Sequence, residues 1–136
     1  MSLEQNKAKV RRLIEEAQVN GDLTVVDELL AEDFIDHSPL GDLPPTRDGV
    51  RMLFGAMRQA FPDLQVVISD QIAEGDRVVT RKSFRGTHRG PFIGVPPSNA
   101  PIDFEVIDIL TFRDGKIAEH RVVVDRYALL SQLGAL

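Results

Sequence analysis

Apolar residues in the first half of the chain recur at the three- and four-residue spacing of amphipathic helices. This spacing predicts a helix over Leu3 to Val19, ended by Asn20-Gly21, a shorter helix over Leu23 to Leu30, and a third after the cap residue Thr46. Phe34-Ile35 is predicted as a brief extended piece. The apolar stripes of the three helices are Ala8, Val10, Leu13, Ile14 and Ala17; Val26, Leu29 and Leu30; and Val50, Leu53, Phe54, Met57 and Phe61. Each helix therefore has one face to bury.

The second half of the chain is rich in valine, isoleucine, threonine and phenylalanine, which favours strands. Gly75-Asp76 and Asp114-Gly115 are two-residue turn signals, and each separates two extended runs. The four predicted strands are Leu64 to Glu74, Arg77 to His88, Ile102 to Arg113 and Lys116 to Val124. A proline-rich loop, 90–101, joins the two hairpins, and Tyr127 to Leu133 is predicted as a last short helix. Helices followed by a mainly antiparallel sheet predict an α+β domain.

The turn at Asp114-Gly115 sets the register of the second hairpin. A two-residue turn places Asp108 opposite Arg121 and Asp125 opposite Phe104. One face of the hairpin then consists of Ile102, Phe104, Val106, Asp108, Leu110, Phe112, Ile117, Glu119, Arg121, Val123 and Asp125. This face is apolar except for four charged residues. A β-bulge would turn the residues beyond it to the other face.

Charged residues on an apolar face need water, a partner or a shifted pKa, because burying an unpaired ion is costly. A polar cavity between this face and the helices would provide all three. In that cavity Asp125 is the predicted acid/base, and Asp108 and Arg121 form an ion pair that orients it. Glu119 lies nearer the rim. A structural interpretation stays open, in which Asp108 and Arg121 are an ordinary cross-strand pair and Asp125 caps the last helix.

The three histidines differ in what their positions predict. His37 follows an apolar pair at a turn, so it is either a second proton carrier at a cavity mouth or a surface turn residue. His88 ends a basic strand beside the proline-rich loop, where it either anchors a substrate oxygen or caps the strand. His120 falls on the face opposite Asp125 in the predicted register, so no chemistry is predicted for it.

Composition narrows the classes of function. The 136 residues are 43% apolar, which fits a single domain over 1–136. A formal net charge of −5 disfavours nucleic acid and anionic membranes as partners. The absence of cysteine excludes thiolate metal sites, disulfides and thiol nucleophiles, and three scattered histidines predict no metal site.

Motifs for other chemistries are missing as well. The sequence has no glycine-rich phosphate loop and no G-x-S-x-G nucleophile motif. No apolar run approaches the length of a membrane span, and the N-terminus lacks a basic-then-apolar signal, so we expect a cytoplasmic protein. What remains is acid/base chemistry without a cofactor, acting on a small molecule.

Four segments together resemble the SnoaL-like polyketide or ester cyclases. They are Asp33-Phe34-Ile35-Asp36-His37, Ala60-Phe61-Pro62-Asp63-Leu64, the stretch from Gly86 to Pro97, and the stretch from Asp114 to His120 ahead of Asp125. They occur in the family's order and cover nearly the whole chain. The resemblance implies a nuclear-transport-factor-2-like fold, in which three N-terminal helices wrap a curved antiparallel sheet into a cone with an internal cavity. It also implies a homodimer or homotetramer assembled through the sheet.

The resemblance also implies a reaction. In these cyclases an aspartate near the end of the last strand is the acid/base of an intramolecular aldol ring closure of an aromatic polyketide ester, and Asp125 matches that position. His37 is the second predicted catalytic residue. The predicted substrate-binding residues are Asp108, Arg121, His88, Phe104 and Phe54. The expected ligand is a small hydrophobic or carbonyl-containing molecule.

Two other functions fit the same fold. One is isomerisation or hydrolysis of a different small apolar substrate, for which an isomerase would need an oxyanion hole from Tyr127 or a protonated Asp108. The other is a noncatalytic ligand-binding or assembly domain. The family often has tryptophan where this chain has Arg121, and this difference favours the noncatalytic alternative.

Overall fold

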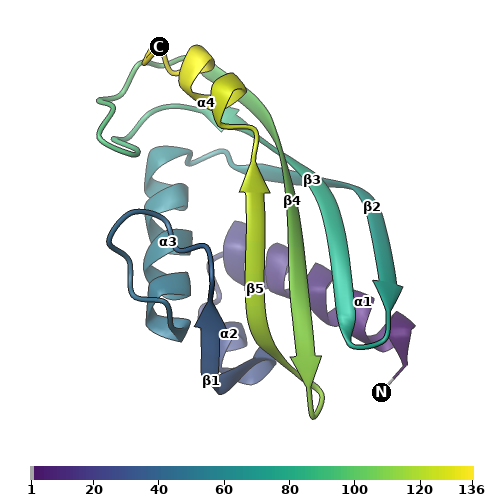
Figure 1. Cartoon of the computed structure of the whole chain (residues 1–136). Coiled ribbons are helices and arrows are strands. Elements are labelled where there is room, and N and C mark those ends of the chain that lie inside the picture. Colours follow the sequence, from purple (N-terminus) through teal and green to yellow (C-terminus); the bar gives the residue numbers. More distant parts are fainter. Residues whose placement is uncertain (1) are drawn as a thin grey trace.

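A curved five-stranded sheet forms one wall of the protein, and helices cover its inner face (Figure 1). The computed structural model describes residues 2–136. Its elements in chain order are α1 (Leu3–Arg12), the π-helix η1 (Leu13–Val19), α2 (Thr24–Leu29), β1 (Leu30–Asp36), α3 (Arg47–Ala60), β2 (Gln65–Glu74), β3 (Arg77–Thr87), β4 (Pro101–Arg113), β5 (Lys116–Val124) and α4 (Arg126–Gln132). The α+β class, the curved sheet and the wrapping helices are as predicted.

The first predicted helix is confirmed over 3–19, with one local difference. Ser2 caps α1 and forms a reciprocal capping box with Gln5. From Leu13 onward the helix widens into η1, and the amide of Asn20 donates to the carbonyl of Glu15, five residues back. The change in helix type leaves the apolar side directed at the sheet.

The strand order is β1-β5-β4-β3-β2, and β2 to β5 form the two predicted antiparallel hairpins. Glu74 pairs with Arg77 across the first turn. In the second turn, Asp114 and Gly115 have φ angles of 51° and 79°, as a type I′ turn requires. The edge strand β1 is longer than the predicted piece at Phe34-Ile35, and it runs parallel to β5.

The predicted register of the second hairpin is confirmed only beside the turn. Arg113 lies opposite Lys116, but a bulge after the first two pairs shifts the register by one residue. Asp108 therefore lies opposite Val122, and the predicted pairing of Asp108 with Arg121 is wrong. Because side chains alternate along a strand, the bulge exchanges the two faces of β5 beyond it.

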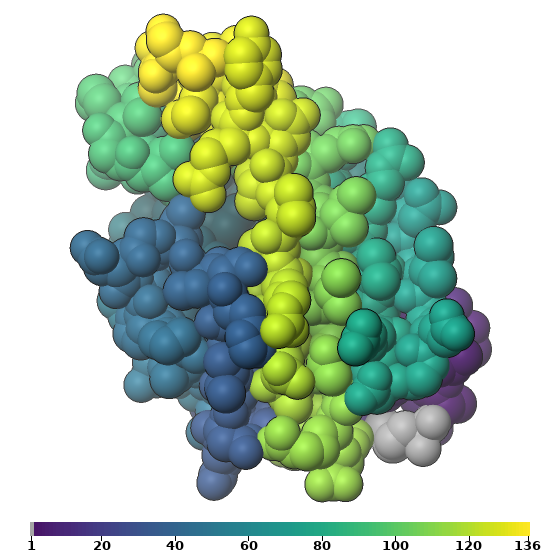
Figure 2. Space-filling model, viewed as in Figure 1, coloured from purple at the N-terminus to yellow at the C-terminus, as the bar shows by residue number. Residues whose placement is uncertain are grey.

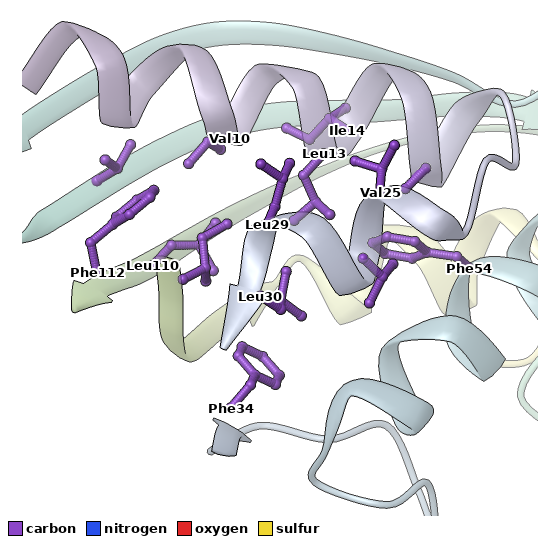
Figure 3. Packing of buried hydrophobic residues seen from close by; sticks show 14 residues of the cluster. Val10, Leu13, Ile14, Val25, Leu29, Leu30, Phe34, Phe54, Leu110 and Phe112 are labelled. Atoms are coloured by element: carbon purple, nitrogen blue, oxygen red, sulfur yellow. The ribbon is translucent and has the colours of Figure 1, made fainter. Parts of the chain in front are cut away.

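Two buried clusters fill the space between sheet and helices. In the first, Val10, Leu13 and Ile14 face α2 and the strand side chains Leu110 and Phe112 (Figure 3). The second cluster lies around the end of α3, the start of β4 and α4. Both clusters contribute residues to the lining of one cavity.

The outer face of the sheet exposes apolar side chains. Ile107 is 45% exposed and Val123 is 75% exposed. The dimer or tetramer expected on this face stays a prediction. Within residues 2–136, no helix has the length and apolar content to span a bilayer.

Candidate active site in the cavity between sheet and helices

A cavity of about 350 Å³ lies between the inner face of the sheet and the helices α1, η1, α3 and α4. Figure 2 shows a hollow in the surface where the start of α4, the loop before β4 and the segment after β1 come together. Most of the lining is apolar, and Phe54, Phe84 and Phe104 contribute aromatic walls. The polar residues of the lining are Gln18, Asp36, Ser38, Lys82, Asp108, His120 and Arg126.

Four of these residues form a polar row across the sheet, one from each of four neighbouring strands: Asp36 on β1, His120 on β5, Asp108 on β4 and Lys82 on β3. His120 Nδ1 lies 3.0 Å from Asp36 Oδ1, and its Nε2 lies 3.9 Å from Asp108 Oδ2. Lys82 Nζ donates to the same Asp108 oxygen at 2.7 Å. The bulge in β5 brings His120 into this row.

The Asp36–His120 pair is built by the register of the two edge strands. Asp36 and His120 are direct partners in the parallel β1–β5 ladder. The Asp36 carboxylate also accepts from the amide of Ser38 at 2.9 Å, an Asx turn that fixes its orientation. Since an ionised carboxylate only accepts, it holds the proton of neutral His120 on Nδ1 and leaves Nε2 free toward the cavity.

The environment of Asp36 keeps this carboxyl ionised. Burial raises its pKa, but the hydrogen bond and the charge of His120, the amide of Ser38 and the charge of His37 together lower the pKa below its usual range. The Asp36 carboxylate of the folded protein therefore binds a proton less readily than the same group in the unfolded chain.

This pKa shift predicts an acid limb in the stability of the protein. The stabilisation is complete above the ordinary carboxyl pKa of about 4 and is lost as pH falls through the lower pKa of the folded state. We expect the Asp36→Asn variant to lose less unfolding free energy than the wild type between neutral pH and pH about 2. Denaturant titrations at several pH values measure this. Asp42→Asn, in an exposed loop, is the control, and equal slopes for all three proteins would contradict the prediction.

Asp108 and Lys82 form an ion pair in the apolar wall. Their side chains are only 4% and 8% exposed. Lys82 pairs with Val106 in the β3–β4 ladder, so it is a diagonal neighbour of Asp108 on the same face. The second carboxylate oxygen, Asp108 Oδ1, is buried and has no hydrogen-bond partner in the described part of the chain. A buried acceptor without a partner is costly, and here the cost falls on a carboxylate that lines the cavity.

The arrangement therefore brings two proton-transfer groups together in the lining of an apolar cavity. They are the Asp108 carboxylate, whose Oδ1 has no hydrogen-bond partner among the described residues, and the imidazole of His120, which Asp36 orients. Lys82 adds a positive charge beside them. Such a set can remove a proton from carbon, stabilise the resulting oxyanion and return the proton.

The predicted substrate-binding residues divide into two groups. Asp108, Phe54 and Phe104 line the cavity as expected. Arg121 does not line it, because the bulge turns its side chain to the outer face, where it is 55% exposed. The geometry supports a cavity wall built from the first group only.

Asp125, the predicted acid/base, is exposed and lies outside the cavity lining. Its carboxylate accepts from the amide of Ala128 at 3.0 Å and caps α4. This is the structural alternative that the sequence left open. The predicted catalytic role of Asp125 thus has no support from this geometry.

His37 and His88 also lie outside the lining. His37 Nε2 pairs with Glu119 at 2.7 Å, with both side chains partly exposed. His88 is fully buried, and its Nδ1 bonds Ser98 Oγ at 2.9 Å. Its backbone also bonds the same loop at Asn99 and Ala100, so His88 holds the proline-rich loop in place.

Sequence reasoning missed Asp36, His120 and Lys82 as site residues. A signal for His120 was present, because Val122 and Val124 alternate with it and offer a second apolar face for β5. Lys82 gave a weaker signal as a charge between the strand residues Thr80 and Phe84, both of which are buried. Within residues 2–136, no three His, Cys, Asp or Glu side chains are arranged to hold a metal ion.

Comparison with known proteins places this architecture and cavity in a family. The family model for SnoaL-like polyketide cyclase matches residues 8–133. A search of curated proteins finds no significant match.

Three solved structures are similar over nearly their whole length. TsrD from Streptomyces laurentii is 27% identical with a TM-score of 0.92, over 100% of this chain and 99% of TsrD. A protein from Jannaschia sp. CCS1, assigned as a SnoaL-like polyketide cyclase, is 28% identical with a TM-score of 0.87, over 98% of this chain and 94% of that one. IdmH from Streptomyces antibioticus, assigned as a polyketide cyclase, is 34% identical with a TM-score of 0.81, over 96% of this chain and 99% of IdmH. The fold is thus nuclear-transport-factor-2-like, and the chain belongs to the SnoaL-like polyketide cyclase family.

Proposed function

We propose that the cavity is the active site of a polyketide-type cyclase that works by acid/base chemistry without a cofactor. The observation that carries this proposal is the polar row in the lining of an apolar cavity, in which Asp36 orients His120 and His120 Nε2 lies 3.9 Å from the buried carboxylate of Asp108. The membership of the chain in the SnoaL-like family supports the class of reaction. The assignments of IdmH and of the Jannaschia protein point to the same class of substrate.

The reaction begins when Asp108 takes a proton from a carbon next to a carbonyl group. The C–H electron pair becomes an enolate, whose oxygen the ammonium of Lys82 stabilises. The enolate carbon then attacks a second carbonyl carbon of the same molecule, and the electron pair of that C=O bond becomes an alkoxide. Asp108 returns the proton to the alkoxide, either directly or through His120 Nε2, which lies 3.9 Å from the carboxylate. Atoms and charge balance, and the site returns to its starting state.

The first step can be tested without knowing the natural substrate. The probe is 2-tetralone, an apolar bicyclic ketone whose CH₂ group between ring and carbonyl is weakly acidic. In D₂O, we expect the wild-type protein to accelerate exchange of these protons, followed by NMR. His120→Gln should slow this exchange about tenfold, since the partly exposed His120 lies between solvent and the buried Asp108 carboxylate, 3.9 Å from its Nε2.

Asp125→Asn is the matched control, because this carboxylate caps α4 outside the cavity. We expect unchanged exchange in this variant. If the wild-type protein does not accelerate exchange, the acid/base proposal fails and a ligand-binding function is favoured. If Asp125→Asn abolishes exchange while His120→Gln does not, the sequence-based assignment of Asp125 is restored.

A further inference from the structure

The cavity lining contains two cations with different surroundings. Lys82 lies deep in the wall, paired with Asp108 at 2.7 Å. Arg126 forms no ion pair with any described residue of the chain. The neighbouring carboxylate of Asp125 accepts from the amide of Ala128. Among the lysines and arginines of the lining, Arg126 is thus the charge without an acidic partner.

Arg126 stands at the mouth of the cavity. It is exposed to solvent and also belongs to the lining, which places it at the boundary between the two. It is the first residue of α4, and the start of this helix borders the hollow in Figure 2. Apart from Ser38 and His120, the other exposed or partly exposed residues of the lining are apolar: Pro39, Leu40, Val50, Leu53, Ile93, Val122 and Val124. Among the exposed or partly exposed lining residues of the described chain, Arg126 is thus the one that is always charged. His120 carries a charge only when it is protonated.

The inner polar row would reject an anionic group. It contains the two carboxylates of Asp36 and Asp108, with the ammonium of Lys82 already paired to Asp108. A carboxylate placed there would lose its hydration and face like charges. At the mouth the same carboxylate keeps part of its hydration and meets a guanidinium, whose planar fork matches its two oxygens.

We propose that Arg126 binds a carboxylate at the end of the substrate remote from the reacting carbonyl. The substrate class is then an apolar carbonyl compound carrying a free carboxylic acid, in contrast to the ester expected from the family resemblance. This inference rests on the proposed function, because the proposed function determines which end of the substrate lies at Asp108 and which end lies at the mouth. The apolar body lies along Phe54 and Phe104, with its carbonyl near Asp108 and its acid at the mouth.

Two probes of the same shape test the carboxylate site: 2-naphthylacetate and its methyl ester. Titration calorimetry at low salt should show that the wild-type protein binds the acid about fivefold more tightly than the ester, the size expected of one exposed charge pair. Arg126→Gln should remove this preference, so that the acid binds no more tightly than the ester. Arg121→Gln, on the outer face of the sheet, is the matched control and should keep the preference.

The inference is overturned if the wild-type protein binds the ester as tightly as the acid, if the preference survives in Arg126→Gln, or if neither probe binds. Exchange of 2-tetralone, which carries no charge, separates these outcomes from failure of the proposed function. Proton exchange of 2-tetralone without tighter binding of the acid would contradict only the role of Arg126. An acid preference without exchange leaves a carboxylate-binding cavity that does no proton chemistry.

Discussion

Replacing Asp108 by asparagine is expected to slow 2-tetralone exchange by about a hundredfold to ten-thousandfold, the range for loss of a positioned general base. The change removes one negative charge and keeps the size and planarity of the side chain. An amide oxygen can still accept from Lys82, which lies 2.7 Å from the present carboxylate oxygen. The variant therefore loses the base and keeps one hydrogen bond to Lys82, but it leaves the buried ammonium without its counterion. Exchange rates measured by NMR, with circular dichroism as a check on folding, decide the result.

A second variant protects this test against misfolding. Asp108→Asn leaves the buried Lys82 ammonium without its counterion, which could prevent folding. If it does, the double variant Lys82→Met with Asp108→Asn removes that ammonium as well. A folded Asp108 variant that exchanges 2-tetralone as fast as the wild type would contradict the assignment of the base. Retained binding of the naphthylacetate ester, with exchange lost, is the expected combination.

The fold follows from local patterns that the sequence displays. The hairpin at Asp114-Gly115 has a strong signal, because both residues adopt the positive φ angles of a type I′ turn. The helix over 3–19 has an apolar stripe, and its capping residues Ser2 and Gln5 lie three positions apart in the sequence. Each of these features depends on neighbours within a few residues. Such features can be predicted from one sequence.

The candidate site depends on features that are not local. Both faces of β5 carry apolar residues: Ile117 and Val123 on the predicted face, Val122 and Val124 on the other. One bulged residue is enough to exchange these faces, and no residue type marks it. Register arithmetic from the turn was therefore correct for two pairs and wrong beyond them.

The pairing of Asp36 with His120 adds a second nonlocal requirement. The two residues are 84 positions apart, and they meet because β1 joins the edge of the sheet in parallel with β5. A turn does not connect these strands, so no turn fixes their register. The Asp36-His37 motif indicates the correct segment of the chain, but Asp36 lines the cavity and His37 lies outside the lining. β1 ends at Asp36, and the chain bends away from the sheet at His37.

Replacing Lys82 by methionine is expected to lower the unfolding free energy by about 3–5 kcal/mol, because it leaves the Asp108 charge buried without its partner. The side chains of Lys82 and Asp108 are 8% and 4% exposed, so water cannot easily replace the ammonium. Methionine keeps the unbranched apolar stem of the side chain but loses the ammonium, including its cation–π contact with Phe84, whose ring centroid lies 5.5 Å from Lys82 Nζ. Denaturant titration at neutral pH measures the change, with Lys116→Met at the surface as the control.

The double variant Lys82→Met with Asp108→Leu separates the cost of an orphaned charge from the cost of lost packing. An apolar pair of similar volume needs no counterion, so we expect its stability to return to within about 1 kcal/mol of the wild type, or above it. The same protein should lose 2-tetralone exchange entirely, since it has no base. A double variant as unstable as Lys82→Met would mean that the shape of the wall, and not the charge pair, controls stability. Recovery of stability with loss of exchange would show that the buried pair is kept for its chemistry, at no benefit to the fold.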